Sequence, residues 1–146
     1  SLTVSDGITP VLVIPDFELS TQKARDVLPE GYSRRDAVFN IQRAPLMVAA
    51  LTRGDWQMLS EAMRDRIHQP YRAGLIPGFE SVLKMETEGV AGIALSGAGP
   101  TVLAFARPEA AVFVGDQIVE MFGRSGVSAS ARVCSIDTGG RCFLPR

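Results

Sequence analysis

The sequence predicts an α+β fold, namely a ferredoxin-like two-layer sandwich with a mostly antiparallel sheet and helices on one face. The first observation is the segment Gly92–Phe105, GIALSGAGPTVLAF, in which two apolar runs flank a glycine loop, as in paired strands. The second is that strand-like runs are mixed with amphipathic helical segments along the 146 residues. Because short hairpins join several runs, neighbouring strands can be antiparallel, which favours this fold over a doubly wound parallel sheet.

The N-terminal region predicts one strand followed by a short helix. Ile8–Ile14 is rich in β-branched residues and predicts a strand, and Pro10 should place its start at a sheet edge or in a bulge. Ser20 or Thr21 is expected to cap a helix over Gln22–Leu28, because a side-chain hydroxyl can accept a hydrogen bond from a free amide of the first turn.

A longer helix is expected next. Ser33 and Asp36 resemble a capping box, and Gly54 is suited to end the helix after Arg53 in the left-handed conformation. Pro45 lies inside this segment and should kink the helix, since proline removes one hydrogen bond of the ladder and crowds the preceding turn.

The middle of the chain predicts two more helices separated by a break. Asp55 should cap a third helix, whose polar residues Glu61, Arg64 and Asp65 form a solvated surface. The apolar residues of this helix follow helical spacing: Trp56, Leu59, Met63 and Ile67. His68–Arg72 is interpreted as a loop, and a fourth helix is expected over Phe79–Glu88.

The C-terminal part predicts a helix and a final hairpin. Pro108 should begin a fifth helix, since proline is favoured in the first turn. Its buried face is expected to contain Ala110, Ala111, Val114, Ile118, Met121 and Phe122. Ser128–Ile136 alternates like a strand, turns at Thr138–Gly140 and returns through Cys142–Leu144.

Composition indicates a soluble globular domain, with 46% hydrophobic residues, 21% charged residues and a net charge of −1. Without a basic stripe, nucleic acid is not an expected partner. The longest charge-free span, Gly89–Ala106, holds four glycines and a proline and is not a membrane helix. The chain has no leader-like start, so we expect a cytoplasmic protein. Residues 1–146 form one domain, and its mid-chain-like first residues suggest that it belongs to a longer protein.

Cys134 and Cys142 are the two cysteines. With an even-length hairpin loop they would lie on opposite faces, and with an odd-length loop opposite each other, so a disulfide stays open. Reduced thiols are the favoured interpretation for a cytosolic protein. With one histidine and no Cys-x-x-Cys motif, the sequence predicts no metal site.

The glycine loop Ser96–Thr101 is the first candidate for function. Gly97 and Gly99 can adopt a positive φ and carry no Cβ, so the loop can bring its backbone N–H groups close to an anion. The alternative is a tight turn between two core strands that needs glycine only for its geometry.

Two further stretches carry candidate binding residues. Thr21 and Arg25 are four residues apart and share a helix face, where a guanidinium beside a helix N-terminus favours an anion. In His68–Arg72, a proline-stiffened loop presents a histidine and an arginine. The alternatives are a surface arginine in the first stretch, and in the second a His68 that caps helix carbonyls with an Arg72 that pairs with a surface acid. No carboxylate pair, Ser-His-Asp set or general base is evident.

Three stretches together resemble the C-terminal half of the homoserine kinases, a family within the GHMP kinase superfamily. They are Phe17–Pro29 (FELSTQKARDVLP), His68–Arg72 (HQPYR) and Leu95–Thr101 (LSGAGPT), and the helix opening Asp36–Asn40 (DAVFN) agrees with them. The glycine loop marks the superfamily, whereas the other two stretches point to homoserine. The resemblance implies transfer of the ATP γ-phosphoryl group to the side-chain hydroxyl of L-homoserine, with Mg²⁺, in threonine biosynthesis.

The resemblance also implies roles for individual residues. Arg25 and Arg72 would bind the homoserine carboxylate, because a planar guanidinium fork matches that anion. Six residues would be substrate-binding: Thr21, Arg25, His68, Arg72, Ser96 and Gly97. Ala98 and Gly99 would support the phosphate-binding loop, which belongs to another domain.

The sequence departs from the family in lacking the nucleotide loop Pro-x-x-x-Gly-Leu-Gly-Ser-Ser-Ala. The N-terminal domain that binds most of ATP and Mg²⁺ is therefore absent from this chain, which is expected to hold no catalytic residue and to be inactive alone. Pro45 also interrupts a helix that is unbroken in the family. An exposed face toward the missing domain would allow a homodimer. Two alternatives stay open: a superfamily kinase for another small alcohol, and a stand-alone ferredoxin-like binding or regulatory module.

Overall fold

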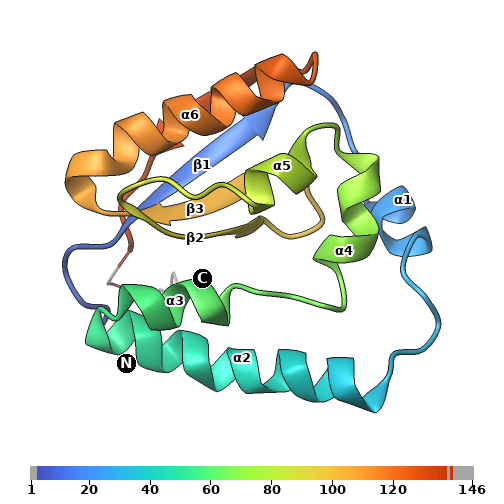
Figure 1. Ribbon diagram of the computed structural model, residues 1–146, viewed down its shortest axis with the longest axis horizontal. Coiled ribbons are helices and arrows are strands. Elements are labelled where there is room, and N and C mark those ends of the chain that lie inside the picture. The colour runs from blue at the N-terminus through green and yellow to red at the C-terminus, as the bar shows by residue number, and fades with distance from the viewer. Residues whose placement is uncertain (1–2, 138, 140–146) are drawn as a thin grey trace, which may run out of the picture.

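The computed structural model describes residues 3–137 and 139 (Figure 1). Its elements in chain order are β1 (Thr9–Pro15), α1 (Thr21–Asp26), α2 (Arg34–Arg53), α3 (Trp56–Ala62), α4 (Gln69–Arg72), the 3₁₀ helix η1 (Ala73–Leu75), α5 (Phe79–Leu83), β2 (Val90–Leu95), β3 (Val102–Ala106), the 3₁₀ helix η2 (Pro108–Ala110), α6 (Ala111–Arg124) and β4 (Ala129–Val133). None of the described helices is both long and apolar enough to span a membrane.

The four strands form one antiparallel sheet in the order β2-β3-β1-β4. Val11 on β1 lies opposite Ala104 on β3 and Val133 on β4. With α5 between β1 and β2 and α6 between β3 and β4, this order is that of a ferredoxin-like β-α-β-β-α-β unit. The predicted α+β class and antiparallel sheet are therefore confirmed.

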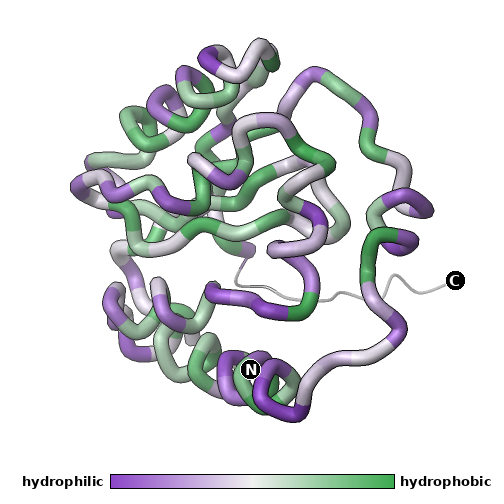
Figure 2. The backbone as a smooth tube through the Cα atoms, turned by 45° about the vertical axis from the view of Figure 1, so that its right-hand side comes forward, coloured by the Kyte–Doolittle hydropathy of each residue, from purple (hydrophilic) through white to green (hydrophobic). Residues whose placement is uncertain are grey.

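The main core lies between the sheet and the two helices α5 and α6 (Figure 1). Alternate residues of β1 and β3, such as Val11 and Val102, point to this side and are fully buried. They meet Phe79 and Val82 of α5 and Ile118 of α6. Figure 2 shows that hydrophobic residues dominate the strands in the middle of the molecule, whereas α2 alternates between hydrophobic and hydrophilic residues.

A second core lies on the opposite side, where the α2–α3 pair packs against β2 (Figure 1). Ala50 of α2 and Leu59 of α3 are buried here with Ala91 of β2. The contact is close at Gly92, where an added Cβ would lie 2.5 Å from the sulfur of Met63. The expectation of helices on one face therefore holds for α5 and α6, while α2 and α3 form a separate layer across β2.

The boundaries of α2 and α3 follow the predicted capping residues. The Ser33 hydroxyl accepts a hydrogen bond from the Asp36 amide at 3.1 Å, and Gly54 ends α2 with a φ of 65°. The carboxylate of Asp55 accepts a hydrogen bond from the Met58 amide at 2.9 Å and caps α3. Between these caps α2 continues through Pro45 as one helix of 20 residues.

Pro10 is the clearest local correction, because it lies in β1, an interior strand, rather than at an edge or in a bulge. Its carbonyl faces β4 and accepts a hydrogen bond from the Cys134 amide at 2.8 Å, one residue beyond the last β4 residue of the ladder. Proline has no amide to donate to β4. Because the regular β1–β4 ladder begins only at Val11, no hydrogen bond of that ladder is lost at Pro10.

Other predicted boundaries also change. α1 ends at Asp26, two residues before the predicted end, and α5 ends at Leu83 rather than Glu88. α3 ends at Ala62, so Ile67 does not continue its apolar face. The predicted turn at 138–140 and the return strand through Cys142 lie outside the described residues, and so does the question of a disulfide.

Candidate functional site

A cleft of about 710 Å³ lies between α1, α2, α3, α4 and the glycine loop. Six of the eight residues that the sequence singled out line it: Thr21, Arg25, His68, Arg72, Gly97 and Ala98. Ser96 and Gly99 are not among the lining residues. The three sequence stretches, widely separated along the chain, thus meet at one site.

The glycine loop that borders the cleft is closed by its own backbone. The Ser96 amide donates to the Thr101 carbonyl at 2.8 Å, and the Gly99 amide donates to the Ser96 carbonyl at 3.2 Å. Gly97 and Gly99 have φ values of 63° and 88°, as predicted, and the Gly99–Pro100 peptide bond is cis. Gly97 faces the cleft, whereas Gly99 packs against the core, where an added Cβ would lie 3.0 Å from Ile76.

Arg72 joins all three stretches. It is the last residue of α4, so the predicted loop over His68–Arg72 is largely one helical turn. Its Nε donates to the Ala24 carbonyl of α1 at 2.9 Å, and its Nη1 donates to the Gly97 carbonyl of the glycine loop at 3.2 Å. The alternative in which Arg72 pairs with a surface acid is therefore wrong for the described part of the chain. Both acceptors are neutral, so the guanidinium keeps its full charge beside the cleft.

Arg25 is the second cation at this end of the cleft. It projects from α1, whose first turn is capped by the Ser20 hydroxyl accepting from the Lys23 amide at 3.3 Å. Thr21 lies one turn earlier and lines the same cleft. Arg25 is exposed, and within residues 3–137 and 139 it makes no ion pair or side-chain hydrogen bond. Its guanidinium is thus available to a ligand.

Asp65 lines the cleft and is largely buried, although the sequence indicated a solvated residue. Its side chain is only 13% exposed. It accepts hydrogen bonds from Asn40 Nδ2 of α2, from the His68 amide at 2.7 Å and from the amides of Ile67 and Gln69. Burial by itself would raise the pKa of Asp65, but these donors outweigh it and hold the pKa below its ordinary value of 3.8.

In the described part of the chain the His68 ring contacts the Asp65 carboxylate and no helix carbonyl, so the alternative in which it caps a helix is wrong. Its ring Nδ1 lies 3.3 Å from the Asp65 carboxylate, and about half of its side chain is exposed. The imidazole therefore lies at the cleft, next to a carboxylate that can orient it.

The opposite wall carries two further cations, Arg43, which the sequence did not single out, and Arg64, which the sequence placed on a solvated surface. Arg43 of α2 pairs with Glu61 of α3, and its guanidinium lies 3.2 Å from the centroid of the Phe39 ring. Arg64 binds the other oxygen of Glu61 at 2.9 Å, and its hydrogen bond, together with the charges of both arginines, lowers the pKa of Glu61. The spacing of Asn40 and Arg43, three residues apart on one helix face, was the available signal.

No metal centre is formed by the part of the chain that the structure describes, since no three His, Cys, Asp or Glu residues are clustered there. Asp65 lines the cleft, but its carboxylate oxygens are occupied by amide donors. The residues present do not fit a Mg²⁺ site of their own.

The comparisons with known proteins agree with this geometry. The family model described as GHMP kinases C terminal matches residues 47–124. The chain belongs to the GHMP kinase C-terminal family. The matched region of this GHMP domain includes α3, α4, the glycine loop and α6, and therefore much of the cleft.

Two curated relatives of the GHMP domain are homoserine kinases. The homoserine kinase of Solibacter usitatus is 46% identical over 129 residues, which cover 88% of this chain and 42% of the relative. The homoserine kinase of a Synechococcus strain is 45% identical over 132 residues, which cover 90% of this chain and 43% of the relative. The chain thus spans less than half the length of these relatives.

Solved structures show the same fold. The crystal structure of homoserine kinase from Cytophaga hutchinsonii matches with a TM-score of 0.85 and 29% identity, over 92% of this chain and 44% of that one. Galactokinase from Lactococcus lactis, solved with galactose, matches with a TM-score of 0.54 and 13% identity, over 87% of this chain and 45% of that one. At that identity the second likeness concerns the fold alone.

Proposed function

We propose that this GHMP domain is the substrate-side part of a homoserine kinase, which transfers the γ-phosphoryl group of ATP to the side-chain hydroxyl of L-homoserine in threonine biosynthesis. The observation that carries the proposal is the convergence of Arg25 and Arg72 on one cleft beside the glycine loop. The choice of homoserine is supported by relatives of that name, 46% and 45% identical over most of this chain.

In this proposal, the two guanidinium groups bind the carboxylate of homoserine. Arg25 has no competing partner in the described part of the chain, and Arg72 is held in place by two carbonyls while its Nη2 makes no hydrogen bond there. A planar fork matches a carboxylate with two parallel hydrogen bonds. Thr21, His68 and Gly97 line the cleft in which the substrate would bind, and Ala98 lines it where it would support the phosphate-binding loop of the other domain. Ser96 and Gly99 act by shaping the loop.

We also propose that ATP and Mg²⁺ are bound mainly by an N-terminal domain of the full-length protein, so that the isolated chain is inactive. Mg²⁺ neutralises phosphate charge when it is bound there. Phosphoryl transfer depends mostly on positioning and electrostatics, and this chain contributes by holding the acceptor. We further propose that the reaction takes place in the cytoplasm.

The test is ADP formation by the full-length enzyme with and without homoserine. Replacing an arginine that binds a carboxylate removes charge-assisted hydrogen bonds, so Arg25→Ala should raise the KM for homoserine about 10- to 100-fold. The KM for ATP should stay within about twofold, since the site for ATP is elsewhere. Arg124→Ala is the matched control, because Arg124 lies on α6 and pairs with Glu120 outside the cleft.

Three results would contradict the proposal. An unchanged homoserine KM in Arg25→Ala would favour a kinase for another small alcohol. Homoserine-dependent ADP formation by the 146-residue chain alone would refute its inactivity. A gene that encodes no Gly-Leu-Gly-Ser-Ser-Ala loop upstream of Ser1 would favour a stand-alone binding module.

A further inference from the structure

The short helix α4 is held by contacts outside itself. It contains only four residues, Gln69–Arg72, and continues into the 3₁₀ helix η1. A single helical turn is not stable alone, because very few hydrogen bonds compensate for the conformational entropy lost when its residues become ordered. Its amides at the N-terminal end also need acceptors. Arg72 is the last residue of α4, so its position depends on the contacts that fix the first residues of the helix.

Asp65 supplies those acceptors. One carboxylate oxygen accepts from the amides of His68 and Gln69, and the other accepts from the Ile67 amide and from Asn40 Nδ2. The amide oxygen of Asn40 in turn accepts from the Arg66 backbone at 2.9 Å. The segment before α4 is thus bound to α2 through both the amide nitrogen and the amide oxygen of the Asn40 side chain.

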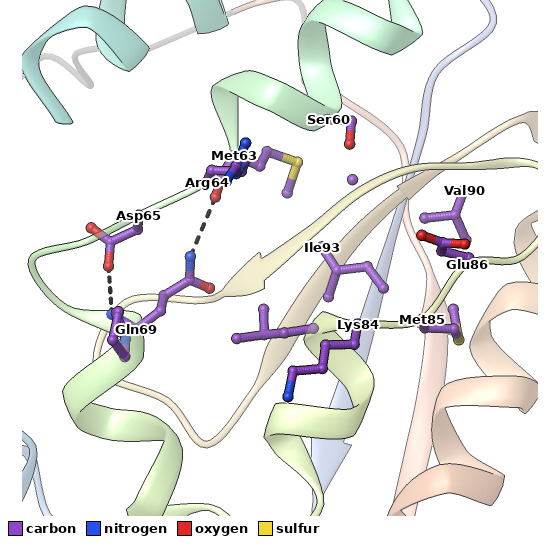
Figure 3. A pocket seen from close by; sticks show the side chains of 13 residues that line it. Ser60, Met63, Arg64, Asp65, Gln69, Lys84, Met85, Glu86, Val90 and Ile93 are labelled. Atoms are coloured by element: carbon purple, nitrogen blue, oxygen red, sulfur yellow. Dashed lines mark hydrogen bonds between the residues drawn. The ribbon is translucent and has the colours of Figure 1, made fainter. Parts of the chain in front are cut away.

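Gln69 fastens the same turn to the sheet. Its buried side chain donates to the Met63 carbonyl at 3.3 Å and accepts from the Leu95 amide of β2 at 2.9 Å. Figure 3 shows Asp65 and Gln69 side by side at the wall of a smaller pocket of about 390 Å³, which adjoins the cleft. Both residues line the pocket and the cleft, and their hydrogen bonds hold them between the two.

We propose that Asp65, held by Asn40, is a positioning residue that fixes α4 so that Arg72 reaches the substrate cleft. The path is continuous: Asn40 to Asp65, Asp65 to the first amides of α4, and Arg72 at the end of α4 to the carbonyls of Ala24 and Gly97. The inference rests on the proposed function, in which Arg72 binds the homoserine carboxylate. Asp65 acts mainly through the backbone amides of residues 67–69, and its carboxylate also lies 3.3 Å from the His68 ring.

The experiment compares two capping aspartates in the full-length enzyme. Asp65→Asn replaces the carboxylate by an amide of similar size and weakens the acceptors of α4. Asp55→Asn makes the same change at the cap of α3, where Asp55 accepts from the Met58 amide and lies outside the cleft. Since an asparagine offers one uncharged acceptor oxygen in place of two charged ones, Asp65→Asn leaves some of the donors around Asp65 without an acceptor and should raise the homoserine KM about 10-fold.

A general loss of stability would affect both variants alike, and the KM for ATP serves as an internal reference. Asn40→Ala should raise the homoserine KM by about threefold, and its effect should not add fully to that of Asp65→Asn, since the two residues share one network. Hydrogen exchange over residues 67–72 should be faster in Asp65→Asn and unchanged in Asp55→Asn.

The outcomes separate this inference from the proposed function. A rise in homoserine KM confined to Asp65→Asn and Asn40→Ala, with faster exchange in α4, supports the positioning role. An unchanged KM, or equal shifts in Asp65→Asn and Asp55→Asn, overturns it. If the wild-type enzyme does not phosphorylate homoserine, the proposed function fails, and unaltered exchange over residues 67–72 would also overturn the structural part of the inference.

Discussion

The two ends of the cleft both carry arginines but use them differently. At the α2–α3 end, Arg43 and Arg64 share the carboxylate of Glu61, and Arg43 lies over the ring of Phe39. At the α1–α4 end, Arg72 is held by two main-chain carbonyls and Arg25 is exposed. One carboxylate offsets part of the positive charge of the first set, whereas the second set has no carboxylate partner in the described part of the chain.

This difference separates arginines that hold the fold from arginines that are available to a ligand. A guanidinium that is paired and packed on an aromatic ring contributes to stability and offers little attraction to an anion. A guanidinium oriented by neutral carbonyls is fixed in place and still attracts one. The comparison predicts that substitutions at the two ends affect different measurements.

The largest effect on stability is expected at Arg43. Arg43→Ala removes the contact with Phe39, the ion pair with Glu61 and the packing of the aliphatic stem, which together should cost about 2 kcal/mol in the free energy of unfolding. Arg25→Ala should change the same quantity by at most about 0.5 kcal/mol, as expected for an exposed side chain. Urea denaturation of both variants measures the free energy of unfolding. Equal losses in Arg43→Ala and Arg25→Ala would contradict the distinction between the two ends of the cleft.

The next effect concerns pH and Asp65. Its pKa in the folded chain lies below the ordinary value of 3.8. Such a group stabilises the folded state above that ordinary value, and the contribution is lost as the pH falls through the pKa of the folded state. The stability advantage of the wild type over Asp65→Asn should therefore shrink between about pH 5 and about pH 2 in chemical denaturation. A stability advantage that is constant with pH would contradict a lowered pKa of Asp65 in the folded chain.

The smallest effect is expected at Glu61. About two-fifths of its side chain is exposed, so solvent screens its ion pairs, and Glu61→Gln should cost at most about 1 kcal/mol in the free energy of unfolding. The difference from wild type should decrease at high salt, because screening weakens exposed pairs further. The KM for homoserine should be unchanged in the full-length enzyme. A rise in that KM would show that the paired end also contributes to substrate binding.

Local features of the fold could be predicted where they depend on neighbouring residues. The caps at Ser33 and Asp55, the end of α2 at Gly54 and the positive φ of Gly97 all follow from interactions within a few residues of chain. The position of Pro10 could not, because the sequence does not tell which strand is central. Similarly, periodicity extended α3 to Ile67, whereas the chain turns away after Ala62 to reach the cleft.

By itself, the sequence determined the α+β class, most helix and strand positions and six residues that line the cleft, since capping, alternation and motif chemistry are written in short stretches. The tertiary structure alone decided how these residues act. Arg72 bonds to Ala24, 48 positions away, and Asp65 to Asn40, 25 positions away. Such contacts depend on how helices pack, and packing determines which charges are neutralised, which are merely held, and which are free to bind.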